Sequence, residues 1–169
     1  SEFIADLLSG NIPKITLCIS SISGAVTTTN FPDYVTSCVV KGPINTTDYT
    51  NGNTIALEIS GYLCRKEISQ GFEGCHQIHL LGNMRTVQSK SIDSFIDINS
   101  LGAIYGDNIA VHIVVRSTFL DNRVSENRAN FTVPASIIDD IVKTSVEQSL
   151  KLFAPTGEKP LFAGRTTNS

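Results

Sequence analysis

Apolar and polar residues alternate along most of the chain, a pattern typical of half-buried β-strands. The clearest run covers residues 108–119, where β-branched residues dominate and alternate positions share a face. Similar alternation predicts strands at residues 15–20, 54–64, 75–81, 92–98 and 129–133. Segments 54–64 and 75–81 are expected to form an antiparallel pair joined by a mobile loop over residues 67–74, and 92–98 an edge strand.

Helical spacing occurs at two places. Apolar residues between Asn30 and Gly42 recur at three- and four-residue steps, which predicts a short helix near residues 31–40. A single apolar stripe from Ile137 to Phe153, opened by Pro134, predicts a longer amphipathic helix over residues 135–153. Residues 42–53, with Pro43 and the pair Asn51-Gly52, are expected to form turns.

These elements predict one α+β domain. We expect a mainly antiparallel sheet of five or six strands, with the helix 135–153 packed on one face. Residues 1–3, Ser-Glu-Phe, resemble a vector-derived remnant, the domain is expected over 4–153, and 154–169 form an extended or disordered tail.

Composition narrows the functional classes. The 169 residues are 41% hydrophobic, and 13 Lys and Arg stand against 16 Asp and Glu, for a formal net charge of −3. A protein that neutralises many phosphates of a duplex needs an excess of positive charge, so sequence-specific nucleic-acid binding is not expected. No apolar run approaches the roughly 20 residues of a membrane-spanning helix.

Cys18, Cys38, Cys64 and Cys75 contain no CxxC pair, and buried thiols are the simplest interpretation. Two disulfides remain an alternative in an oxidising compartment, where Asn45 and Asn130 would also be glycosylation acceptors.

Three potential metal ligands, Cys75, His76 and His79, lie within five residues. On a strand His76 and His79 point to opposite faces, and Cys75 lies roughly 13 Å from His79, so no metal site is predicted. His112 sits within the strongest predicted strand, where a hydrogen-bonded structural histidine is favoured over a general base.

Other catalytic patterns are also missing. The sequence has no G-x-S-x-G elbow, and the glycine segment 102–106, interpreted as a loop, lacks the lysine of a phosphate-binding loop. The carboxylate pair Asp139-Asp140 is explained by a helix start. We therefore predict no catalytic, cofactor-binding or metal-binding residue and no enzymatic activity.

The order of these elements resembles that of the matrix proteins of rhabdoviruses, with a plant-infecting branch as the nearest guess. The matching stretches are residues 104–116, the polar turn to Arg128, and residues 131–153, with an overall agreement of about two thirds of the chain. The family's basic, lysine-rich N-terminal tail and proline-rich budding motifs do not occur in this sequence, and a truncated N-terminus would explain their absence.

The resemblance implies a non-enzymatic virion component that self-associates and links the nucleocapsid to the membrane during assembly and budding. Its location would be the virion and the cytoplasm or inner membrane face of the host cell. Two other classes stay open: a secreted or cell-surface β-sandwich of an adhesin, filament or stator, which would be extracellular, and a viral movement or capsid-type β-domain.

Weak homo-oligomerisation is the partner prediction that the residues themselves suggest. Leu161 and Phe162 form an apolar pair in the otherwise polar tail, which we expect to be too polar to join the core and able to dock on a neighbouring copy. Phe72, in the loop 67–74, is the alternative contact.

Overall fold

The computed structural model describes residues 16–20, 26–30, 35–48, 53–69, 71–154 and 161–163, with side chains described from Ile55 onward except at 67 and 68. In chain order these residues form β1 (Thr16–Ser20), β2 (Val26–Asn30), β3 (Val35–Asp48), β4 (Asn53–Arg65), η2 (Lys66–Ser69), β5 (Gln77–Gly82), β6 (Arg85–Ser91), η3 (Asp93–Phe95), α2 (Ile98–Tyr105), β7 (Ile109–Arg116), α3 (Thr118–Asp121) and α4 (Ala135–Phe153). Here η denotes a 3₁₀-helix.

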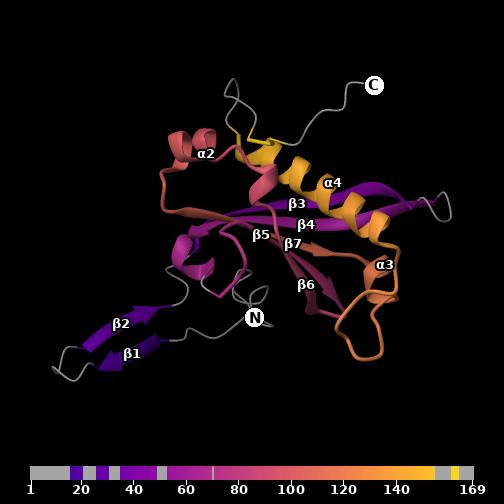
Figure 1. The fold of residues 1–169 in the computed structure, drawn as a ribbon, viewed down its shortest axis with the longest axis horizontal. Helices are drawn as coiled ribbons and strands as arrows, with labels where there is room; N and C mark the ends of the chain where they lie inside the picture. Colours follow the sequence, from indigo (N-terminus) through magenta and orange to yellow (C-terminus); the bar gives the residue numbers. More distant parts are fainter. Residues whose placement is uncertain are drawn as a thin grey trace.

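One five-stranded sheet has the order β3-β4-β7-β5-β6, and β1 and β2 form a separate antiparallel pair (Figure 1). The predicted α+β class is confirmed. The sheet is mixed, because β5 and β7 run parallel while the other three pairings are antiparallel. Parallel neighbours need a long crossover connection. Here β6, η3 and α2 lie between β5 and β7 in the chain and supply that connection.

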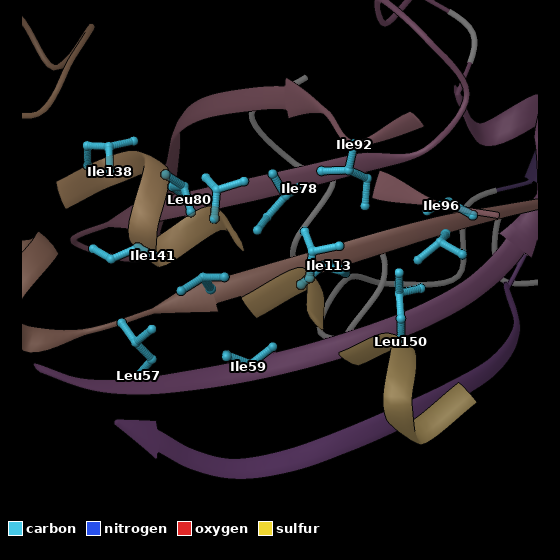
Figure 2. Close-up of a cluster of buried hydrophobic side chains, with 14 of the residues drawn as sticks. Leu57, Ile59, Ile78, Leu80, Ile92, Ile96, Ile113, Ile138, Ile141 and Leu150 are labelled. Carbon is cyan, nitrogen blue, oxygen red and sulfur yellow. The ribbon is translucent and has the colours of Figure 1, made fainter. Parts of the chain in front are cut away.

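The central strand β7 is buried on both faces. Its odd-numbered residues Val111, Ile113 and Val115 belong to the main hydrophobic core, in which Leu57, Ile59, Ile78 and Leu80 from the neighbouring strands also lie (Figure 2). Its even-numbered residues Ala110, His112 and Val114 are equally buried on the opposite face. Strong alternation in the sequence therefore marks a fully buried strand with one polar member.

Helix α4 covers the apolar face of the sheet (Figure 1). Its bounds and its packing on one sheet face are as predicted, and its apolar stripe is buried at Ile137, Ile138, Ile141, Val142, Val146, Leu150 and Phe153. The helix approaches β4 most closely at Gly61, where a Cβ atom would lie 2.8 Å from Cζ of Phe153. The missing side chain at Gly61 thus sets how near the C-terminal end of α4 can lie to the sheet.

The helix predicted near residues 31–40 is wrong for residues 35–40, which belong to β3; residues 31–34 lie outside the described residues. Turns predicted over 42–53 are also wrong for 42–48, which continue β3 along β4, whereas Asn51-Gly52 lies outside the described residues. Pairing with β4 outweighs the weak helical spacing. Pro43 is accommodated because β3 is an edge strand and its register shifts between Val40 and Pro43.

Several predicted strands and pairings are also corrected. Strand β7 lies between β4 and β5, so segments 54–64 and 75–81 do not pair with each other. Residues 92–98 do not form the edge strand, which is β6; instead, Asp97 caps α2 by accepting a hydrogen bond from the Ser100 N–H at 3.1 Å.

The glycine segment interpreted as a loop lies largely in α2, which extends to Tyr105. Residues 129–133 form no strand; their backbone makes one isolated antiparallel bridge, between Phe131 and Val124. In both places a local pattern was too short to distinguish a strand or loop from a helix or a single bridge.

The close approach at Gly61 gives a first testable prediction. Gly61→Ala should lower the free energy of unfolding by about 1 to 3 kcal/mol, because the added methyl group overlaps the buried ring of Phe153. Alanine in a strand would otherwise be favoured over glycine by roughly 0.5 to 1 kcal/mol. Urea unfolding of the variant, and of the same variant carrying Phe153→Leu, measures the effect and its partial relief. A Gly61→Ala protein as stable as the parent contradicts the packing described.

Candidate functional site

The sheet face opposite α4 carries the polar side chains with the most chemistry. His79 and His112 are both 0% exposed on this face, and Ser89 lies directly across from His79 in the β5–β6 pair. Because β5 and β7 run parallel with Gln77 opposite His112, His79 falls one pleat further along and reaches the ring of His112. Strand register, and not nearness in sequence, brings the two histidines together.

Four hydrogen bonds join these groups into one chain. The hydroxyl of Ser89 lies 2.8 Å from Nδ1 of His79, and Nε2 of His79 lies 2.9 Å from Nδ1 of His112. Nε2 of His112 then lies 2.9 Å from Oγ of Ser69, which donates to the carbonyl oxygen of Cys75 at 2.6 Å. The two imidazole planes differ by only 6°, as an in-plane bond between the rings requires.

The direction of every bond in this chain follows from its last member. A hydroxyl has one hydrogen, and Ser69 gives it to the Cys75 carbonyl, so Oγ of Ser69 accepts from His112. His112 therefore carries its hydrogen on Nε2, its Nδ1 accepts from Nε2–H of His79, and Nδ1 of His79 accepts from Ser89. With both rings neutral, every ring nitrogen has a partner.

Burial favours this neutral state. Burial, with a smaller contribution from the neighbouring His112, lowers the pKa of His79 to about 3. Burial, with His76 nearby, lowers the pKa of His112 to about 4. Protonating both rings would also set Nε2–H of His79 against Nδ1–H of His112. The pair is therefore uncharged at neutral pH.

Phe72 lies over this pair and not at a surface that is free for another molecule. Its ring centroid is 5.4 Å from that of His79 and 6.1 Å from that of His112, in edge-on geometry in both cases. The phenyl ring is half-buried and helps to keep water from the imidazoles. This residue, predicted as an alternative self-association contact, is thus engaged within its own chain.

The other residues of the Cys75-His79 segment have separate partners. Nδ1 of His76 accepts the Val111 N–H at 2.9 Å, so this side chain satisfies a β7 amide just beyond the start of β5. The Asp93 carboxylate accepts the N–H groups of Cys75 and His76 at 3.0 and 2.7 Å. Burial lowers the pKa of His76 and raises that of the Cys75 thiol. Within the described residues, no three His, Cys, Asp or Glu side chains lie close enough to hold a metal ion.

The contact between Ser69 and His112, 43 positions apart, is one that sequence analysis missed. A catalytic serine needs its O–H directed at an unprotonated nitrogen of the base. Here the hydrogen lies on the histidine side and the serine donates to a backbone carbonyl. The arrangement orders η2 against the sheet and does not activate Ser69. Alternation had placed His112 on the less apolar face, but nothing in the sequence indicated its partners.

The C-terminal segment Leu161 to Ala163 docks on the chain's own η3. Ala163 N–H donates to the Phe95 carbonyl and Asp97 N–H to the Leu161 carbonyl, both at 2.7 Å. Leu161 is 1% exposed in the core, and Phe162 stacks on Phe95 with centroids 6.0 Å apart. The expectation that the tail is too polar to join the core is therefore wrong for Leu161, since one buried leucine and two backbone bonds suffice to hold it.

Comparison of the chain with protein-family models, curated proteins and solved structures found no match. In the part of the chain that the structure describes, no helix has the length and apolar character needed to cross a membrane.

The neutral histidines predict a stability loss in mild acid. Each unfolded histidine gains a proton below pH about 6.5, whereas folded His79 and His112 resist protonation until about pH 3 and 4. Their contribution is thus complete above pH 6.5 and is lost as pH falls. Between pH 6.5 and 5 the free energy of unfolding should drop by up to about 1.4 kcal/mol per pH unit for each histidine.

Urea unfolding from pH 7.5 to 5 measures this slope. The variant His79→Gln removes one titrating ring but keeps an amide that can donate and accept. Its slope should be shallower than that of the parent by about one proton. Equal slopes would mean that His79 titrates normally in the folded protein.

Proposed function

We propose that this chain is a non-enzymatic, matrix-like viral structural protein that self-associates through weak contacts and links a nucleocapsid to a membrane during assembly. The docked segment Leu161 to Ala163 is the observation that carries the self-association part. The nucleocapsid and membrane partners, and a location in the virion and at the inner face of the host membrane, rest on the resemblance of residues 104–116 and 131–153 to rhabdovirus matrix proteins.

The docked segment supports exchange between copies because its contacts are few and local. They consist of the buried Leu161 side chain, the stack of Phe162 on Phe95 and two backbone hydrogen bonds. Burying the leucine side chain contributes about 2 to 3 kcal/mol, which ordering several residues at roughly 1 to 2 kcal/mol each largely offsets. The segment can therefore leave its site without unfolding the domain.

A second copy offers the same site with the same contacts, because Phe95, Ile96 and Asp97 are present on every chain. Exchange of an identical element is a low-cost route to association, and a head-to-tail exchange that does not close grows into an array. Reversible links of this kind suit a layer that forms and disassembles. Leu161 and Phe162 thus remain the self-association residues of the proposal, now with a defined receptor.

A structural function also agrees with the closed polar chain Ser89-His79-His112-Ser69. Its hydrogens are all committed within the protein, and its rings are buried and neutral. This constellation, which has the strongest resemblance to a catalytic one among the described residues, is thus explained as support for the sheet.

The alternative of a secreted β-sandwich receives less support from the fold. A sandwich packs two sheets face to face, whereas α4 covers the apolar face of the five-stranded sheet here. A viral capsid-type or movement-protein domain would share the self-association step, so the experiment below tests the assembly step common to both viral classes.

The proposal predicts that association depends on the C-terminal segment. In sedimentation across a concentration series, the parent should show reversible, concentration-dependent growth in size, and Leu161→Ala should weaken the association constant about tenfold or more because it removes most of the buried contact. Leu152→Ala is the matched control, since Leu152 is 49% exposed on α4 and should leave association unchanged.

A chain ending at Ala154 completes the test. It retains the receptor on η3 but lacks the segment, so it should stay monomeric alone and bind a peptide of residues 155–169 in trans. Concentration-independent monomers for both the parent and the shortened chain would remove the tail from the proposal.

A further inference from the structure

A small hollow lies at the turn between β5 and β6, beside the segment that follows α3. Its volume is about 250 Å³, and Arg85, Thr86, Asn127 and Arg128 contribute to its lining. Sites for drug-sized ligands occupy roughly 300 to 1,000 Å³, so this hollow suits a smaller ligand. It lies apart from the histidine chain and from the C-terminal segment.

Positive charge is concentrated here without a neutralising partner. Arg85 and Arg128 are both exposed, and neither forms an ion pair with any described residue. None of the lining residues is acidic. The nearest acids in the chain are otherwise placed: the Asp121 carboxylate accepts the Asn83 N–H at 2.7 Å, and Glu126 is exposed on the loop without lining the hollow.

Neutral donors accompany the two guanidinium groups. Oδ1 of Asn127 accepts from the Ser125 hydroxyl at 2.7 Å and from the Ala129 N–H at 3.1 Å, so the Nδ2 hydrogens of Asn127 remain without a described acceptor. The hydroxyl oxygen of Thr86 is buried and has no hydrogen-bond partner among the described residues. The hollow is therefore rich in donors and poor in acceptors.

The backbone around the hollow is held in place before any ligand arrives. Arg128 has a φ of +54°, and its N–H donates to the Ser125 carbonyl at 2.8 Å. The same loop is closed by a bond from Ser125 N–H to the Asn130 carbonyl at 2.9 Å. A left-handed conformation costs energy for arginine, and persists here because the loop's hydrogen bonds enforce it. Binding would thus require little additional ordering.

We infer that this hollow is a binding site for a phosphate-class oxyanion, with Arg85 and Arg128 as its principal ligands. A guanidinium group presents N–H donors in a planar fork that matches phosphate oxygens. The ligand is a free phosphate, a phosphorylated solute or the phosphomonoester headgroup of a lipid, which share this chemistry. The inference does not depend on the proposed function.

The test uses the full chain labelled with ¹⁵N and titrated with inorganic phosphate at constant ionic strength. Amide shifts should saturate and cluster at residues 82–87 and 124–128. The double variant R85Q/R128Q should bind about tenfold more weakly or worse, since each lost charged hydrogen bond removes about one such factor. R65Q/K143Q removes the same charge from two exposed residues outside the hollow and should bind like the parent.

Vesicles of phosphatidylcholine with and without phosphatidic acid separate the ligand sources. Capture by phosphatidic acid vesicles that R85Q/R128Q abolishes assigns the site to a lipid headgroup, and saturable phosphate binding without capture assigns it to a soluble ligand. Either supports the inference. Equal losses in the two double variants, shifts outside the hollow, or no binding of either probe by the parent would overturn it; the amide spectrum of R85Q/R128Q confirms in each case that the variant is folded.

Discussion

The burial of β7 on both faces is the constraint on which the remaining structure depends. One face joins the hydrophobic core beneath α4, whereas the other places His112 where no water reaches it. A buried polar ring without partners is costly, so His112 must find both a donor and an acceptor inside the protein. His79 provides the donor and Ser69 the acceptor. The position of β5 beside β7 and of η2 beneath the sheet both meet this requirement.

The same constraint separates scaffold from working surface. The histidine chain holds η2, β5, β6 and β7 together and leaves no hydrogen for chemistry. The features able to contact other molecules lie at the periphery: the docked segment at Leu161 and the hollow between Arg85 and Arg128. A rigid sheet with exchangeable or charged attachments at its rim is consistent with an assembly protein whose partners bind and leave.

Helix α4 and strand β7 could be predicted from sequence because each has one strong periodicity and one continuous partner surface. Strand β3 could not, since its pairing with β4 outweighs local spacing and places Pro43 at an edge irregularity. The contacts of His112 were hidden because they depend on the parallel pairing of β5 with β7, which the crossover decides. Leu161 was equally hidden, because a single apolar residue in a polar tail has no periodicity.

The central claim is that His79 and His112 are neutral and that each carries its hydrogen on Nε2. Long-range ¹H–¹⁵N correlation of the imidazole rings observes this directly, because protonated and unprotonated ring nitrogens differ in chemical shift. The account predicts neutral Nε2–H tautomers for both rings, unchanged between pH 7.5 and 5. An Nδ1–H tautomer at His112, or titration of either ring near pH 6.5, would contradict it.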